Sequence, residues 1–153
     1  MGFTTPSLKG RALRLLGQRE HSRLELQRKL APHVQEGEDL VAVLDELEAK
    51  GFISEQRVVD SVLHQRARRL GSARIRQELQ AKGIAPEAMA QALDGLRDTE
   101  LARAAEVWRQ RFGGSNPATD PREHARQVRF LMARGFSAET VRRVVRGRGP
   151  DDE

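Results

Sequence analysis

Apolar side chains recur every three or four positions along almost the whole chain of 153 residues, and Gly or Pro interrupts them at short intervals. This spacing places the apolar residues on one face of an α-helix, whereas a half-buried strand would need strict alternation. Tyr is absent and β-branched residues are few, which leaves little material for a sheet. The sequence therefore predicts an all-α protein built from short amphipathic helices.

Start and stop signals divide the pattern into nine predicted helices. Ser22 is followed three residues later by Glu25, the order of a capping box, and Thr99 is predicted to cap the seventh helix. Gly51 is placed as a left-handed cap that ends a helix, and the fourth helix is predicted to run to about Arg69. The helices are predicted to begin near Ser7, Ser22, Asp39, Ser54, Pro86, Thr99, Asp120 and Ser137, with one more after the break at Gly71-Ser72.

Short sequence repeats indicate that the helices form three similar units. The segment ELQRKL at 25–30 aligns with ELQAKG at 78–83, and the latter aligns with RFLMARG at 129–135. A unit of about 50 residues buries little apolar surface alone, so we expect neighbouring units to stack into an elongated, curved array. The predicted three-helix, helix-turn-helix-like repeats are 1–53, 54–98 and 99–148, followed by an acidic tail at 149–153.

The composition bounds the environment of the protein. The chain contains no Cys, which excludes disulfides, thiolate zinc sites and thiol nucleophiles, and this fits a reducing cytosol. No apolar run is long enough to cross a bilayer, and the N-terminus lacks the apolar stretch of a signal peptide. We therefore expect a cytoplasmic protein that makes no membrane contact.

Catalytic and metal-binding motifs are missing from the sequence. None of the four His shows the spacing of a metal motif, and no Gly-rich segment ends in the Gly-Lys-Ser/Thr of a phosphate-binding loop. His21 and Glu25 lie one turn apart across a helix start, and we interpret them as capping or surface residues. Trp108 is interpreted as a core residue rather than a stacking platform. We expect a binding protein that is not an enzyme and needs neither cofactor nor metal.

Charge is distributed unevenly along the chain. Residues 31–60 hold eight acidic and two basic side chains, and the cluster from Glu36 to Glu48 is interpreted as a solvated helix face. A patch that meets a basic partner is the alternative. The basic residues number 27, and 23 of them are Arg, whose planar fork suits phosphate and carboxylate. A GC-rich genome would also raise Arg over Lys, so the clustering carries more weight than the total.

Arginine gathers in three rows in the second and third predicted units. The first of these rows lies at the end of one predicted helix and the start of the next. Cations stabilise a helix C-terminus through the helix dipole, which accounts for part of this row but not for five charges across a helix junction. Rows that repeat along a curved array predict one cationic surface for a polyanion. The rows are Arg66, Arg68, Arg69, Arg74 and Arg76; Arg122, Arg126, Arg129 and Arg134; and Arg142, Arg143, Arg146 and Arg148. The candidate partner-binding residues are Arg66, Arg68, Arg69, Arg74, Arg76, Arg126, Arg129, Arg134, Arg142 and Arg143.

Four motifs follow one another along the chain: REHSRLELQRKL at 19–30, LDELEAKGFISE at 44–55, RIRQELQAKGI at 74–84 and FLMARGFS at 130–137. In this order they resemble the motifs of the RecX family of bacterial regulators of the RecA recombinase. The third is the most specific of them, and together they span most of the chain.

The resemblance implies three tandem three-helix repeats that lodge in the helical groove of the RecA–DNA filament. Such a protein restrains filament growth, strand exchange and the coprotease function that drives the SOS response. We expect a monomer whose contact with DNA is weak or occurs through the filament. The alternative is a stand-alone helical DNA-binding protein, because each unit holds helix-turn-helix-like pairs. The acidic stretch at 31–60 argues against a continuous DNA footprint, and a scaffold for another acidic protein is a third possibility.

Overall fold

A computed structural model describes residues 5–113 and 120–146. Within these ranges every regular element is helical, which confirms the all-α prediction. The elements are α1 (Leu8–Gln18), α2 (Arg23–Leu30), the short 3-10 helix η1 (Ala31–His33), α3 (Leu40–Ala49), α4 (Glu55–Arg66), α5 (Ser72–Ala81), α6 (Pro86–Arg97), α7 (Glu100–Phe112), α8 (Pro121–Ala133) and α9 (Ala138–Val145). Most of the predicted loop at 113–117, Arg148 and the acidic tail at 149–153 lie outside the described residues.

Side-chain caps begin most of the helices. The Ser22 hydroxyl accepts the Glu25 N–H while the Glu25 carboxylate accepts the Ser22 N–H, so the predicted capping box is present. Thr99, however, does not cap α7: its hydroxyl donates to the Leu96 carbonyl, because its own backbone is already helical and turns the side chain back toward α6. Ser7, Asp39, Ser54, Asp120 and Ser137 make the other side-chain caps.

The helices α3, α5 and α8 end in the same turn. Each is followed by a glycine with positive φ, a conformation that costs other residues energy: Gly51 (80°), Gly83 (73°) and Gly135 (91°). The next N–H then bonds to a carbonyl five residues earlier, as in a Schellman motif, at 2.9 Å in α3 and 3.1 Å in α5. The turn returns an apolar residue to the core each time: Ile53, Ile84 and Phe136 are buried.

Each group of three helices closes its own apolar core. We call α1–α3 unit 1, α4–α6 unit 2 and α7–α9 unit 3. Leu26 and Leu47 lie in the first core, Ile75 and Leu79 in the second, and Leu131 in the third, all with no exposed surface. Because the three cores are separate, the units meet mainly through polar groups at two joints.

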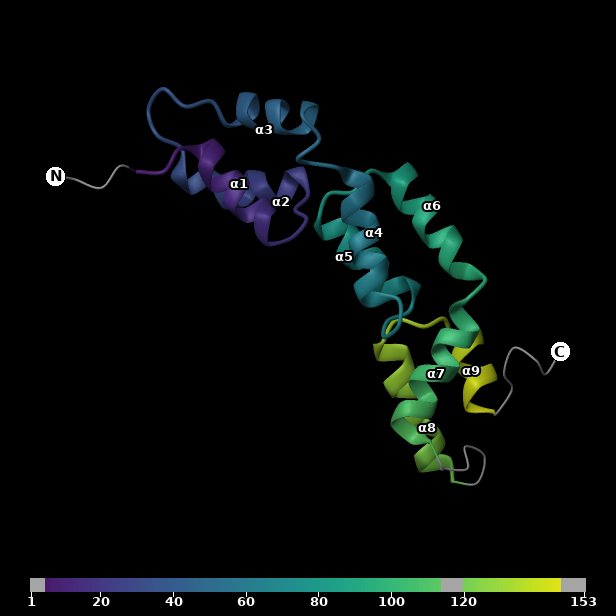
Figure 1. The fold of residues 1–153 in the computed structure, drawn as a ribbon. Helices are drawn as coiled ribbons and strands as arrows, with labels where there is room; N and C mark the ends of the chain where they lie inside the picture. The colour runs from purple at the N-terminus through teal and green to yellow at the C-terminus, as the bar shows by residue number, and fades with distance from the viewer. Residues whose placement is uncertain (1–4, 114–119, 147–153) are drawn as a thin grey trace.

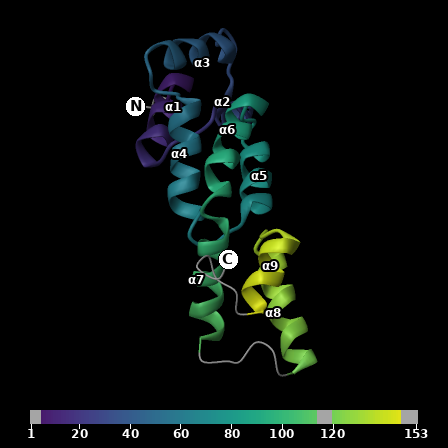
Figure 2. The same cartoon turned by 90° about the vertical axis from the view of Figure 1, so that its right-hand side faces the viewer.

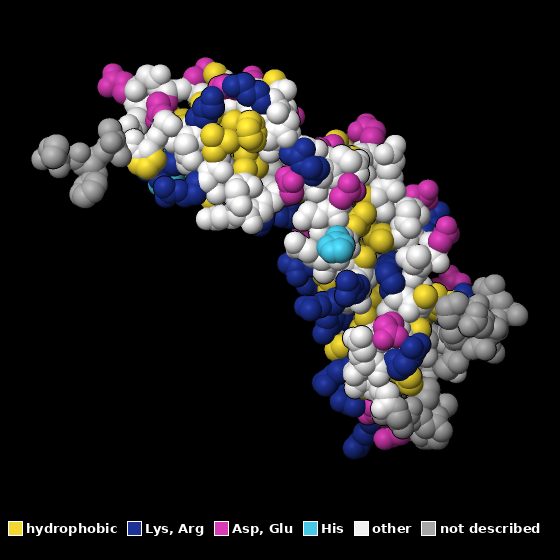
Figure 3. All heavy atoms as spheres, in the orientation of Figure 1, with side chains coloured by type: hydrophobic (Ala, Val, Ile, Leu, Met, Phe, Trp, Pro, Cys, Tyr) yellow, Lys and Arg dark blue, Asp and Glu magenta, His cyan; other side chains and the backbone are white. Residues whose placement is uncertain are grey.

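The units follow one another in an elongated, bent array. Figure 1 shows unit 1 turned away from the line formed by units 2 and 3, and Figure 2 shows α7 continuing the array beyond α6. Lys and Arg side chains gather along the inner edge of this bend over units 2 and 3, as Figure 3 shows. The inner edge of the bend is therefore cationic over units 2 and 3.

Candidate partner-binding surface

The predicted arginines all lie in units 2 and 3, but they do not form one continuous row. Arg66 is in the last turn of α4, which ends there and not near Arg69, because the Arg69 N–H bonds to the Arg66 carbonyl only three residues earlier, at 3.0 Å, as in a turn. Eight of the ten are exposed, and Arg134 and Arg143 are half-buried. Arg68 and Arg69 lie in the turn after α4, Arg74 and Arg76 on α5, Arg126 and Arg129 on α8, Arg134 at its C-cap, and Arg142 and Arg143 on α9.

An open groove of about 310 Å³ brings parts of two predicted rows together. It lies where the end of α4 meets α7 and the last turn of α8. Four arginines line it, Arg68, Arg69, Arg111 and Arg134, together with Val107, Gln110 and Phe130. Within the described part of the chain, no carboxylate lies within ion-pair distance of these four arginines. We call this feature the arginine groove.

Two phenylalanines, Phe112 and Phe130, lie close to the guanidinium groups of Arg111 and Arg134 in the groove. The Cζ atom of Arg134 lies 4.8 Å from the centre of the Phe130 ring, and that of Arg111 lies 5.7 Å from it. Phe130 is braced edge-on by Phe112, with ring centres 5.3 Å apart. A guanidinium against an aromatic ring is stabilised by cation–π attraction and keeps its N–H edge available. Arg111 is a site residue that clustering missed, since it lies in a stretch where acidic residues outnumber basic ones.

Other predicted arginines are occupied within the fold. Arg66 pairs with Glu78 at 3.3 Å, and Arg126 pairs with Glu123 at 2.8 Å, a bond that raises the pKa of Arg126. Arg76 lies apart from the arginine groove and lines a wider depression of about 580 Å³ that also contains Glu100. The predicted first row is therefore divided between two surfaces.

Main-chain groups join units 2 and 3. The N–H groups of Gly71 and Ala73 donate to the carbonyls of Arg134 and Gly135 at 2.8 and 3.1 Å, so the end of α8 caps the start of α5. The Ser72 N–H donates to the Glu100 carboxylate at 3.2 Å. A Cβ atom on Gly71 would overlap the main chain of Gly135, which explains a glycine at that position. The joint fixes the position of Arg134 opposite the end of α4.

Arg103, on α7, also joins units 2 and 3. Its guanidinium donates to the carbonyls of Ala67 and Leu70 at 2.9 Å each and to that of Leu96 at 3.2 Å, so one side chain serves the ends of both α4 and α6. Burial lowers the pKa of Arg103, and the charge of Glu100 partly offsets this. Sequence spacing offered no signal for this role, because its partners are main-chain atoms of another unit.

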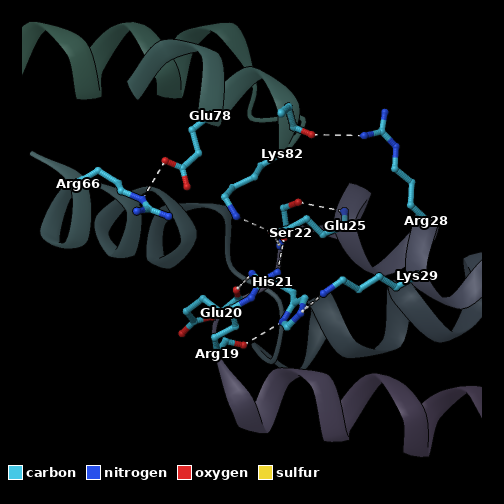
Figure 4. A network of polar contacts seen from close by, with 11 residues as sticks. Arg19, Glu20, His21, Ser22, Glu25, Arg28, Lys29, Arg66, Glu78 and Lys82 are labelled. Atoms are coloured by element: carbon cyan, nitrogen blue, oxygen red, sulfur yellow. Dashed lines mark hydrogen bonds and ion pairs between the residues drawn. The ribbon is translucent and has the colours of Figure 1, made fainter. Parts of the chain in front are cut away.

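Side-chain ion pairs join units 1 and 2 (Figure 4). The Glu25 carboxylate accepts from Arg19 at 2.7 Å within unit 1 and from Lys82 of unit 2 at 3.2 Å. Arg57 of unit 2 pairs with Glu20 of unit 1 at 2.9 Å. Burial on its own raises the pKa of Glu25, but the hydrogen bonds from Arg19 and the Ser22 N–H, with the charge of Lys82, lower it to about 2.

His21 is buried between Arg19 and Lys29 of unit 1, so it is not the surface residue that the sequence suggested, whereas Glu25 does belong to the capping box. Only 1% of the residue is exposed. Its Nε2 lies 3.1 Å from the Lys29 Nζ and its Nδ1 lies 3.0 Å from the Arg19 carbonyl. Since an ammonium only donates and a carbonyl only accepts, Nδ1 carries the proton and the ring is neutral. Burial lowers the pKa of His21, and the charges of Arg19 and Lys29 lower it further, against the Arg19 carbonyl bond that raises it.

Two other predicted features have a structural account. The Trp108 ring is half-buried beside the third core, and its N–H donates to the buried Gln127 amide at 2.8 Å. In the acidic cluster, Glu46 pairs with Lys9 and Lys50 at 2.7 and 2.8 Å, so part of that face is neutralised internally. Residues 5–113 and 120–146 hold no group of three His, Asp or Glu that could bind a metal ion. No helix within them is long and apolar enough to span a membrane.

Comparison with known proteins identifies the family. The models of the second and third three-helix domains of RecX match residues 54–93 and 98–145. A regulatory protein RecX from Leptothrix cholodnii is 61% identical over 140 residues, covering 92% of this chain and 88% of that protein. The RecX from Ralstonia nicotianae is 47% identical over 141 residues, covering 92% and 87%.

Solved structures share the fold. A crystal structure of regulatory protein RecX superposes with a TM-score of 0.75 at 19% identity, covering 90% of this chain and 70% of that one. The crystal structure of RecX from Lactobacillus salivarius gives a TM-score of 0.70 at 18% identity, covering 92% and 93%. With the matches of sequence and domain models, the chain belongs to the RecX family of regulatory proteins.

Proposed function

We propose that this chain is a non-catalytic, monomeric regulator that binds the RecA–DNA filament in the cytoplasm and inhibits the recombinase, ATPase and coprotease activities of RecA. Its membership of a family whose members are named regulatory proteins supports a regulatory role. The observation that carries the proposal is the arginine groove, four guanidinium groups gathered across two units of a bent array. A curved cationic surface of this kind attracts an extended polyanionic assembly.

The direct test is the activity of RecA itself. Added in stoichiometric amounts, the protein should lower the DNA-dependent ATPase and the strand-exchange activity of RecA and should sediment with RecA filaments. The double reversal Arg68→Glu/Arg69→Glu should weaken both effects, with an unchanged circular dichroism spectrum. Arg14→Glu/Arg28→Glu makes the same charge change at exposed positions of unit 1, outside the groove, and should behave as wild type. Full RecA activity in the presence of the wild-type protein would disprove the proposal.

A stand-alone DNA-binding protein is the alternative function, and the same groove could serve it. That function predicts tight, strongly salt-dependent binding to duplex DNA and no effect on RecA beyond competition for DNA. Doubling the DNA concentration should then restore RecA activity, whereas an inhibitor that binds the filament would still act.

A further inference from the structure

We propose that the arginine groove binds the phosphate backbone of single-stranded DNA. The idea that this strand is the one inside a RecA filament rests on the proposed function. The assignment of the groove to nucleic acid rests on the donor and acceptor groups that line it.

The side chains of the arginine groove are almost purely donors. Arg68, Arg69, Arg111 and Arg134 have no acceptor atoms, and among the described lining side chains only the Gln110 amide offers an acceptor. A phosphodiester backbone is the matching ligand, because its charged oxygens only accept. A peptide would bring its own N–H groups, which would find few partners here.

The depression around Arg76 has the opposite character. Its lining combines the donors Arg76 and Arg97 with the Glu100 carboxylate, and Gln77, Gln80 and Ser137 can both donate and accept. Leu93 and Phe136 add apolar surface. A mixture of donors, acceptors and apolar groups is typical of protein interfaces.

The geometry of the groove favours binding of a single strand without base specificity. The groove is open, and its volume of about 310 Å³ matches a short stretch of one phosphodiester backbone rather than the full width of a duplex. Arg111 and Arg134 both lie against the Phe130 ring, so a base that stacked on it would compete with them. Cation–π contact holds these two guanidinium groups in place before the ligand arrives, which reduces the entropy lost on binding. The arginines lie on both sides of the joint between units 2 and 3, so a bound strand would cross that joint.

The experiment measures binding of a fluorescein-labelled oligothymidylate to the full chain, without RecA, by fluorescence anisotropy at several salt concentrations. Arg68→Gln/Arg111→Gln removes one guanidinium from each side of the groove. It should weaken binding about tenfold and reduce the slope of log K against log salt by about 1.4, since each lost phosphate contact on a single strand contributes about 0.7. Arg14→Gln/Arg28→Gln, with the same net charge, should leave both values close to wild type. Arg111→Lys keeps the charge but loses the planar fork, and should give an intermediate affinity with a normal melting temperature.

Three results would overturn the assignment. The first is equal oligonucleotide affinity for wild type and Arg68→Gln/Arg111→Gln. The second is tighter binding to duplex than to single strands through the same arginines. The third is a wild-type protein that binds RecA filaments through the groove but binds no oligonucleotide, which would assign the groove to carboxylates of RecA. Because RecA inhibition is measured separately, its failure would disprove the proposed function and leave the oligonucleotide result standing.

Discussion

Units 1 and 2 meet through charged side chains and a close contact of Gly83 with Leu24, whereas units 2 and 3 are also joined by hydrogen bonds between main-chain groups. In the first joint Glu25 pairs with Lys82 and Glu20 with Arg57. In the second, Gly71 donates to the Arg134 carbonyl with no room for a side chain between them. Ion pairs between long side chains keep much of their energy when the units shift, but main-chain hydrogen bonds do not.

This difference separates a rigid part of the array from an adjustable one. The arginine groove needs Arg68 and Arg69 at a constant distance from Arg111 and Arg134, and it lies across the rigid joint. Unit 1 carries the acidic α3 and is attached by contacts that salt and acid weaken. We therefore expect units 2 and 3 to move as one body and unit 1 to adjust its angle to a partner.

The largest effect should come from Gly71→Ala. The new methyl group would overlap the main chain of Gly135 and force units 2 and 3 apart, at a cost of about 3 kcal/mol in the free energy of unfolding. Urea denaturation measures this cost, and oligonucleotide binding should fall with it. Gly17→Ala in α1, where a Cβ meets no other atom, is the matched control and should stabilise by about 0.5 kcal/mol. Equal stability of the two variants would refute the close-packed joint.

Arg103→Met should have the next largest effect. The substitution keeps the apolar stem but leaves the carbonyls of Ala67, Leu70 and Leu96 without their shared donor, which should cost about 2 kcal/mol. Arg109→Met, on the same helix, removes only an exposed pair with Glu106 and should change the unfolding free energy by less than about 0.5 kcal/mol. If both variants unfold at the same urea concentration, Arg103 does not hold the joint.

Acid should loosen the joint between units 1 and 2 through Glu25. The folded-state pKa of about 2 is below the ordinary value of 4.5, so the unfolded chain binds protons first as the pH falls. The stabilisation is complete above pH 4.5 and is lost between pH 4.5 and about 2. Glu25→Gln should cost about 1 kcal/mol at pH 7 and make unfolding less dependent on pH in that window. Glu87→Gln, an exposed carboxylate on α6, should retain the wild-type profile; a wild-type profile for Glu25→Gln would contradict the assignment.

The smallest effect should come from salt on the angle of unit 1. Raising the ionic strength to about 1 M shortens the screening length to about 3 Å, which weakens the pairs Glu25–Lys82 and Glu20–Arg57. Lys82→Gln should have a similar effect at low salt and cost about 0.5 kcal/mol. Energy transfer between dyes on units 1 and 2 should report a wider distribution of distances, while a dye pair on units 2 and 3 should report no change. A wider distance distribution for the dye pair on units 2 and 3 alone would show that their joint, and not the joint between units 1 and 2, is the adjustable one.

Local signals in the sequence predicted most of the helices and their turns. Ser22 with Glu25 predicted a capping box because both partners lie within four residues, and Gly51 predicted a left-handed cap because its neighbours are helical. Thr99 was misread, since the same residue type can cap a helix or bond to the turn before it, and only the course of the chain from α6 decides between these. The repeat boundaries at 53/54 and 98/99 stay a prediction.

The candidate site was only half predictable. Arg68, Arg69 and Arg134 stood out as members of basic clusters, and they do share a groove. Arg111 was missed because its cationic neighbours Arg68, Arg69 and Arg134 lie far from it in the sequence. The burial of His21 was missed because its partner Lys29 lies eight residues away, on the next helix. Whether these residues bind DNA or RecA stays a proposal.

The sequence by itself determined the helices, most of their caps and the three-fold repetition, because these depend on interactions between residues a few positions apart. The tertiary structure decided which arginines are free and which are used, since a guanidinium such as that of Arg103 can be satisfied by carbonyls far along the chain. It also decided the character of the two joints. Gly71 and Gly135 are ordinary turn residues in the sequence, and only their contact in space makes one joint rigid.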